Sequence, residues 1–419
     1  MKFTQLFRKN ILVLTFILLL ANSVFADWIW TKKTSLPFGG KRDRAISFSI
    51  NGFGFVGTGL DSLNLVQNDL WRYDTSSNSW MQMADFPGVP RRDAVAFVID
   101  SFAFVGCGID DSSAWGNTLM DFYKYDPDLN TWDSIAPYSN GTAYGVYKAV
   151  GITVAGKGYV TTGRYYGIPF YQTWVYDPPL DTWIQKSDFP NFAGRNGATG
   201  FSINNKLYLT TGSDDNYYYN DLWEYDLALD VWTQKQDFPG SKRIGAVAFT
   251  IDTLGIVGTG SDGGYTDDFW SYNATDNHWS YVNQFPGGAR RGATGFPLGK
   301  YGYLACGKSE NGTKRDLWQL KYVAPQLPNN VPTVTPSKIF TLYPNVVSVN
   351  STVLLNNVPA GNSSISIFSS DGKLLQQFNQ STKDIFISSE VFTASGEYFI
   401  ELKTVTPSVV SQIQKLIVL

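Results

Sequence analysis

Arginine is the residue type whose spacing in this chain points most directly to chemistry. Five arginines each stand 17 residues before a glycine that ends an apolar run, and they are Arg42, Arg91, Arg195, Arg243 and Arg290. A planar guanidinium can hold a carboxylate through two hydrogen bonds, so this set could bind an acidic ligand. The strict repetition equally favours a structural role, in which each arginine bonds loop carbonyls or a repeated aspartate. The sequence leaves both interpretations open.

Aromatic and acidic side chains accompany these arginines in the longer loops. Tyrosine and aspartate suit contacts with a sugar or a peptide, because they combine ring stacking with directional hydrogen bonds. Six further residues are therefore candidate ligand contacts: Trp115, Tyr138, Tyr165, Tyr166, Asp214 and Tyr218. The alternative is a plain solvated rim.

The sequence offers little for other kinds of site. His278 is the single histidine, which excludes a Ser-His-Asp triad, a multi-histidine metal site and a Cys-His pair. The pairs Asp110-Asp111 and Asp214-Asp215 lack the ligand spacing of a calcium loop. We therefore expect no metal and no cofactor.

Two further classes of ligand are disfavoured. The glycine-rich stretches 194–200 and 288–295 look like phosphate loops, but they lie in register with a repeat and no helix follows them. The net charge is −3, and it becomes −6 when Lys2, Arg8 and Lys9 are removed with the N-terminal segment. A mildly acidic chain lacks the basic surface that nucleic-acid binding requires.

The arginines belong to a repeat of about fifty residues. Its apolar runs end at glycines separated by 49, 55, 49, 48 and 47 residues, which are Gly59, Gly108, Gly163, Gly212, Gly260 and Gly307. Each copy holds four short strand-like segments, with tight turns such as Asn204-Asn205. A period of this size with four strands is typical of a β-propeller with one blade per repeat. The sequence predicts an all-β fold with six blades.

The N-terminal strand is expected to close the ring. Tryptophan recurs in the fourth strand of five copies, at Trp80, Trp132, Trp183, Trp232 and Trp279. The sixth copy lacks this tryptophan, whereas Trp30 stands seven residues before Pro37 just as Trp80 stands seven before Pro87. We predict that the strand from Trp28 completes the last blade beside residues 317–322, which removes an open sheet edge.

These copies resemble the kelch repeat from Trp28 to about Tyr322. The resemblance rests on the arginine before the first strand, the glycine closing the second, the third-strand Tyr-Asp and the spaced tryptophan with its following proline. The first glycine of the kelch Gly-Gly pair is replaced in every copy, by Thr58, Cys107, Thr162, Thr211, Thr259 and Cys306. The resemblance implies a six-bladed kelch-type propeller in which arginines at this position help to bind acidic ligands at the pore mouth.

One face of such a propeller should carry the ligand. The loops between second and third strands share a face with the connections between blades, and the longer ones are 109–120, 164–171, 213–220 and 261–267. Function concentrates on long loops held by a rigid scaffold. Blade 3 departs from the pattern, with Val146 in place of the arginine and Gln172 in place of the third-strand aspartate. We therefore expect the ligand towards blades 2 and 3.

The two ends of the chain differ from the repeats. Residues 1–26 have the basic start, short apolar core and small-residue end of a signal peptide. The propeller is assigned to 27–323, a proline-rich linker to 324–338 and a small β-sandwich to 339–419. No other apolar run is long enough to span a membrane.

The C-terminal segment resembles the sorting domain of the type IX secretion system of Bacteroidetes. It contains Leu-Tyr-Pro-Asn at 342–345, Asp-Gly-Lys at 371–373 and Gly-x-Tyr-x-Ile at 396–400, although Val346 stands where a proline is usual. The resemblance implies that the type IX machinery is a partner and that the protein is secreted or held at the outer-membrane surface. An ordinary adhesive sandwich is the alternative.

The leading hypothesis is a non-enzymatic, monomeric surface protein whose propeller binds a protein or a glycan. The alternative is a sugar isomerase resembling the six-bladed kelch mutarotase that acts on sialic acid, for which no acid–base pair can be assigned. A kelch-containing copper oxidase is excluded, because its site needs two histidines and the chain has one.

Overall fold

The computed structural model describes residues 27–37, 39–111, 116–190 and 194–323, together with the strands of the C-terminal region and residues 391–392. Trp28–Tyr322 forms one compact unit, and the C-terminal strands belong to a second. The expected signal peptide and linker lie outside the described residues. None of the described segments is a helix able to cross a bilayer.

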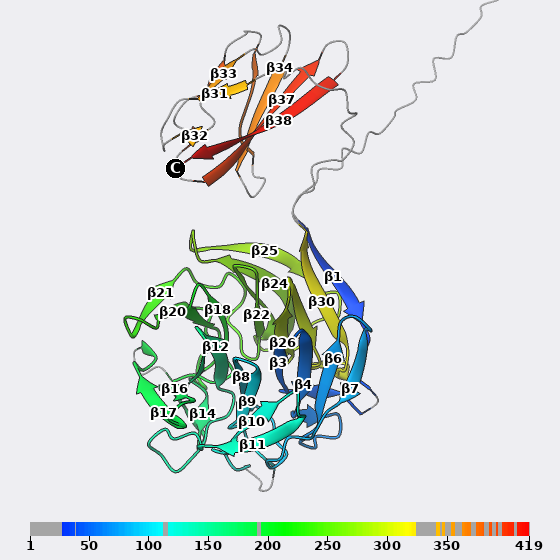
Figure 1. The fold of residues 1–419 in the computed structure, drawn as a ribbon, viewed down its shortest axis with the longest axis vertical. Coiled ribbons are helices and arrows are strands. Elements are labelled where there is room, and N and C mark those ends of the chain that lie inside the picture. The colour runs from blue at the N-terminus through cyan, green and yellow to red at the C-terminus, as the bar shows by residue number, and fades with distance from the viewer. Residues whose placement is uncertain are drawn as a thin grey trace, which may run out of the picture. The chain divides into compact units, whose positions relative to one another are not determined.

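Six four-stranded antiparallel sheets build the first unit (Figure 1). From blade 1 to blade 6 the strands are β3 (Ile46–Ile50), β4 (Phe53–Gly57), β6 (Leu70–Asp74), β7 (Ser79–Gln82); β8 (Val95–Ile99), β9 (Phe102–Gly106), β10 (Phe122–Asp126), β11 (Thr131–Ile135); β12 (Val150–Val154), β13 (Lys157–Thr161), β16 (Thr173–Asp177), β17 (Thr182–Lys186); β18 (Thr199–Ile203), β19 (Lys206–Thr210), β20 (Leu222–Asp226), β21 (Val231–Lys235); β22 (Val247–Ile251), β23 (Leu254–Ser261), β24 (Tyr265–Asn273), β25 (His278–Gln284); β26 (Thr294–Leu298), β27 (Tyr301–Ala305), β30 (Leu317–Val323), β1 (Asp27–Lys33).

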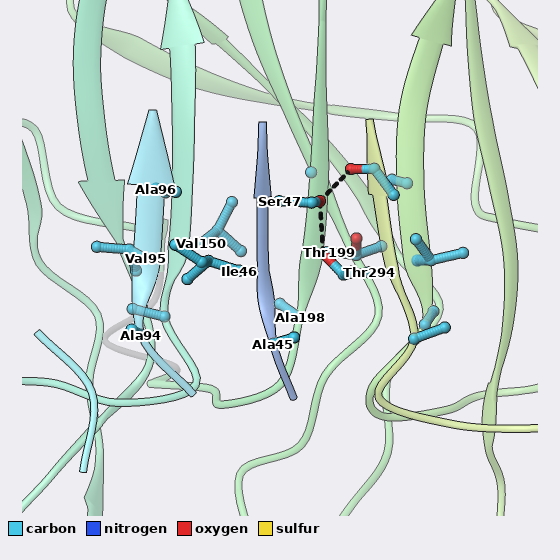
Figure 2. A pocket seen from close by; sticks show the side chains of 18 residues that line it. Ala45, Ile46, Ser47, Ala94, Val95, Ala96, Val150, Ala198, Thr199 and Thr294 are labelled. Atoms are coloured by element: carbon cyan, nitrogen blue, oxygen red, sulfur yellow. Dashed lines mark hydrogen bonds between the residues drawn. The ribbon is translucent and has the colours of Figure 1, made fainter. Parts of the chain in front are cut away.

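The first strands of the blades surround a central channel. Neighbouring first strands contact one another in the order β3, β8, β12, β18, β22, β26 and back to β3, so the ring is closed. Figure 2 shows small side chains just before these strands, such as Ala45, Ala94 and Ala198, and others within them, such as Ala96, around a cavity of about 170 Å³. Their alternating pattern of buried and half-buried residues fits a strand with two unlike faces. The six-bladed all-β fold is confirmed.

The N-terminal strand closes the ring as predicted. β1 pairs with β30 as the outermost strand of blade 6. The Trp28 ring lies 4.8 Å from that of Tyr322, and the Trp30 ring lies 5.0 Å from that of Phe269 in blade 5. The indole of Trp30 also donates a 2.8 Å hydrogen bond to Asn283. The closing strand is therefore held by both the last blade and its neighbour.

The other fourth-strand tryptophans join neighbouring blades. Each indole N–H donates to a main-chain carbonyl in the segment that leads from the preceding blade, at 2.8–3.3 Å. The acceptors are Thr34, Ala84, Ala136, Ser187 and Gln236. A buried indole needs such a partner for its N–H, and this accounts for the strict spacing of the tryptophans.

The two cysteines are free and fully buried, in the same repeat position of blades 2 and 6. Burial raises the pKa of the Cys107 thiol and of the Cys306 thiol to about 12. We therefore expect neither to react with a thiol reagent at pH 8 in the folded protein, and both to react at once after unfolding in denaturant without reductant. A single thiol, or none, in the unfolded protein would contradict the blade positions.

The C-terminal unit contains two sheets. One consists of β31 (Thr341–Tyr343), β33 (Val353–Asn356) and β36 (Ile385–Ile387), and the other of β32 (Val346–Val347), β38 (Val409–Val418), β37 (Gly396–Val405), β34 (Ser363–Ser369) and β35 (Leu374–Gln380). Val353 and Ile387 of the first sheet share one core with Ile367 and Ile400 of the second. This packing of two sheets is a β-sandwich.

Candidate functional site

The five repeated arginines lie inside the propeller. Each is at most 1% exposed, and each guanidinium makes two hydrogen bonds to the aspartate that stands two residues before the third-strand tryptophan or tyrosine of its blade. The pairs are Arg42–Asp69, Arg91–Asp121, Arg195–Asp221, Arg243–Asp268 and Arg290–Asp316, and we call them the framework pairs. Because the two Nη groups of each arginine already hold a carboxylate, this geometry supports the structural interpretation of the arginines over the ligand-binding one.

Each framework arginine also holds a strained residue in place. The position that replaces the first kelch glycine has a positive φ of 54–65° in all six blades, a conformation that is unfavourable for threonine and cysteine. In the five blades with an arginine, its Nη1 donates to the carbonyl of that residue at 2.8–3.1 Å. The arginine therefore braces the turn after the second strand.

Electrostatics favour the ionised carboxylate in two of these pairs, those of Asp221 and Asp316. Burial would raise the pKa of Asp221, but the hydrogen bonds and charge of Arg195 outweigh it and lower the pKa. The same balance lowers the pKa of Asp316 beside Arg290. The carboxylates are thus ionised at neutral pH and take part in the framework.

Blade 3 has no framework pair, and Tyr138 fills part of the space. Val146 is fully buried, and Gln172 bonds the indole of Trp174 instead of an arginine. Tyr138 is 0% exposed and packs its ring edge-on against Trp174 and Trp183. It occupies the repeat position of the phenylalanines that lie under the guanidinium groups elsewhere, such as Phe86 beneath Arg91. Tyr138 is therefore a core residue, contrary to its selection as a ligand contact.

A closed ring of main-chain hydrogen bonds surrounds the channel at its loop-face end. Six residues, one per blade, each donate their N–H to the carbonyl of the equivalent residue in the preceding blade, at 2.8–3.1 Å. They are Arg44, Asp93, Lys148, Gly197, Gly245 and Gly292, and we call them the mouth ring. All six have a positive φ of 52–66°. The ring therefore depends on backbone conformation, and the side chains at these positions can differ.

The side chains divide the mouth ring into two halves. Blades 1–3 contribute Arg44, Asp93 and Lys148, whereas blades 4–6 contribute three glycines. Arg44 and Asp93 of the ring form an ion pair at 3.6 Å, and Arg92, beside the ring, forms a second ion pair with Asp93 at 2.8 Å. The mouth thus has a charged half and an open half, an asymmetry that the sequence repeat does not show.

The predicted tyrosines of blade 3 border the charged half. Tyr166 is 69% exposed and stacks on Tyr144, with ring centroids 4.7 Å apart. Tyr165 is half-buried and packs edge-on against Phe170. Arg164, in the same loop, bonds the Gly167 carbonyl and forms a two-pronged ion pair with Asp215 of blade 4. The loops of blades 3 and 4 are thereby tied together.

The other candidates differ in accessibility. Asp214 is half-buried and accepts hydrogen bonds from the N–H groups of Asn216 and Tyr217 and from the Tyr219 hydroxyl, so it shapes its own loop. Its pKa is lowered because these bonds outweigh the effect of burial. Tyr218 is 38% exposed beside it. Trp115 lies outside the described residues.

The mouth ring and Tyr144 were not predicted from the sequence. The ring positions lie two residues after each framework arginine, so the repeat register could have located them. Their side chains vary from blade to blade, however, and this hides them among loop residues. Among the described residues, no group of three histidine, cysteine, aspartate or glutamate side chains is placed to hold a metal.

Known proteins share the architecture of this propeller. Residues 52–243 match the KLHDC2/KLHL20/DRC7 Kelch-repeats domain. The fold is a kelch-type β-propeller. A solved structure titled "Structure of YjhT" aligns with a TM-score of 0.58 and 18% identity, over 69% of this chain and 97% of that chain. At this identity the likeness concerns the fold alone. No curated protein matches the chain.

Proposed function

We propose that the propeller is a non-enzymatic binding module that takes a protein or glycan ligand on the loop face, beside the charged half of the mouth ring. This proposal rests on the uneven distribution of exposed apolar side chains over that face. Within the described residues, they belong to the loops and connections of blades 1–4: Leu63, Leu65, Val89, Tyr144, Tyr166, Ile168, Tyr217 and Tyr218. The described loops of blades 5 and 6 contribute none.

This one-sided distribution supports binding for a physical reason. Apolar and aromatic groups exposed together on one part of a surface are typical of interaction sites. The framework pairs of blades 1, 2 and 4 and the mouth ring brace the scaffold that carries these loops, which reduces the ordering required when a ligand binds. The stacked pair Tyr144–Tyr166 offers a flat face for a sugar ring or a peptide side chain.

Truncation of an exposed tyrosine tests the proposal. A glycan array and a pull-down with the secreted proteins of the same organism would first provide a ligand. We expect Tyr166→Ala to weaken its binding by about 1–3 kcal/mol, measured by calorimetry, because the ring is a contact residue. The matched control is Leu129→Ala, on a turn of the opposite face, where the side chain is 72% exposed.

Two outcomes would count against this proposal. Equal loss of affinity in the two variants would show that the wrong face was chosen. Exchange of sugar anomers accelerated by the protein, observed by NMR with a panel of sialosides, would favour the isomerase alternative.

We further propose export by the type IX machinery through the C-terminal sandwich, with the propeller presented at the outer-membrane surface. The described strands Thr341–Tyr343 and Gly396–Val405 carry parts of the motifs that suggested it. Cell fractionation with and without residues 339–419 tests this proposal, since the shortened chain should stay in the periplasm.

A further inference from the structure

Lys148 differs from the other cations on the charged half of the mouth ring. Arg44 pairs with Asp43 and Asp93, and Arg92 pairs with Asp93. The ammonium of Lys148 has neither a hydrogen bond nor an ion pair to any described residue, and it lies 6.0 Å from the Tyr147 ring centroid. An ammonium can donate three hydrogen bonds, so this group has unused capacity.

Part of the Lys148 side chain is also removed from solvent. The side chain is half-buried at the channel mouth. Burial lowers the pKa of Lys148, and the attraction of Asp93 is opposed by the nearby positive charges of Arg44, Arg92 and Arg164. A cation that has lost water without gaining a carboxylate is unfavourable. An anionic group bound beside the ammonium would replace the interaction with water that burial has removed.

The surroundings of Lys148 indicate what else the ligand must offer. Arg164 acts on Lys148 by its charge, and its guanidinium also bonds Gly167 at the tip of the loop that carries Tyr166. Tyr147, the neighbour of Lys148, exchanges main-chain hydrogen bonds with Arg164 at 2.8 and 3.0 Å, so the loop that carries Tyr166 begins beside Lys148. On the other side, the ring continues to Gly197, over which the side chain of Ile244 lies. Lys148 thus has the loop of the Tyr144–Tyr166 stack on one side and the Ile244 side chain beside the next ring position on the other.

We propose that the ligand of the loop face is an acidic glycan, with Lys148 holding one anionic group and the Tyr144–Tyr166 stack taking a neighbouring sugar ring. This inference rests on the proposed function and specifies its ligand class. A carboxylate and a sulfate ester would both satisfy the ammonium, whereas a neutral sugar would leave it unpaired. The flat stacked face favours a sugar ring over an acidic peptide.

The test uses four defined probes on the mature full-length chain. They are hexagalacturonate for carboxylates, a sulfated dextran oligomer for sulfate esters, maltohexaose as the neutral glycan and hexaglutamate as the acidic peptide. Calorimetry at low and physiological salt should show binding of at least one acidic glycan and of neither maltohexaose nor hexaglutamate. Preference for hexaglutamate, or equal binding of maltohexaose, would overturn the proposal.

Substitution of Lys148 provides a second test of the same proposal. Lys148→Gln should weaken binding of the acidic glycan at least tenfold and make the affinity less dependent on salt, because one anion contact is lost. Lys148→Arg should retain most of the affinity. The control is Lys157→Gln, which removes the same charge from an exposed position on the tight-turn face of the same blade and should change nothing.

These outcomes separate the ligand class from the binding face. If Tyr166→Ala weakens binding and Lys148→Gln does not, the binding face stands and the acidic-glycan assignment is wrong. If neither variant weakens binding, both are wrong. Thermal melting of each variant shows whether it is folded, and Lys148→Arg distinguishes loss of the charge from disturbance of the mouth ring.

Discussion

Loss of one framework arginine should strongly destabilise the propeller. Arg195→Val is expected to lower the free energy of unfolding by about 3–5 kcal/mol, because it leaves a partly buried carboxylate without its partner. The side chain of Asp221 is 19% exposed, so solvent screens part of this effect and the lower value is expected. The Thr211 carbonyl also loses its 3.1 Å hydrogen bond. Urea unfolding followed by tryptophan fluorescence measures the change.

The chain itself supplies the control for this substitution. Blade 3 folds with Val146 and Gln172 at the two positions of the pair. The double variant Arg195→Val with Asp221→Gln should therefore be more stable than the single variant, since no carboxylate is left unpaired. A double variant no more stable than the single one would show that the ion pair is not the source of the stabilisation.

The dependence on pH has a definite sign. The pKa of Asp221 is lowered in the folded protein. This stabilisation is complete above the unfolded-state pKa of about 3.9 and is lost as the pH falls through the folded value. The difference in stability between wild type and Arg195→Val should therefore shrink on acidification below about pH 4.

Deleting the closing strand should have the second large effect. Without β1, the backbone edge of β30 is open and the contacts of Trp28 and Trp30 with blades 5 and 6 are lost. An exposed edge strand pairs readily with other chains. We expect a chain lacking residues 27–36 to aggregate, as seen by size-exclusion chromatography with light scattering.

A second truncation serves as the control for the first. Ending the chain after Val323 removes far more residues but no strand of any blade. We expect this shortened protein to be monomeric and to melt at the temperature of the propeller in the full chain. Aggregation of both truncated proteins would indicate that the closing strand has no special role.

The fold could be predicted because the repeat encodes it six times. The closing role of Trp30 followed from the register alone, since the same tryptophan-to-proline spacing occurs at Trp80. A local feature that recurs in every blade has to satisfy the same packing, and its structural meaning can be deduced without coordinates.

The candidate site was less predictable for the same reason. The arginines repeat because they are part of the framework, whereas a binding site on a ring of blades needs departures from the repeat. Tyr138 looked like a loop residue because blade 3 lacks the arginine that would have marked its register. No other blade has a lysine at the mouth-ring position of Lys148, where the residues are Arg44, Asp93 and three glycines. The three-dimensional contacts show that Lys148 has no ion pair within the described part of the chain and that Tyr144 stacks on Tyr166. Neither property can be deduced from the sequence.

The mouth ring has a consequence for how such a surface can change over evolution. Its hydrogen bonds use only main-chain atoms, and arginine, aspartate, lysine and glycine all occupy its left-handed conformation in this chain. Exchange among the side chains of blades 1–3 keeps these bonds, whereas a Cβ added at Gly197 would lie 2.3 Å from the side chain of Ile244. Duplication of blades supplies six equivalent backbone positions around the channel mouth, and substitution can change the side chain at a position that has space for it. A new binding specificity can therefore arise from a few substitutions at the channel mouth, while the main-chain hydrogen bonds of the ring and the loops around it are retained.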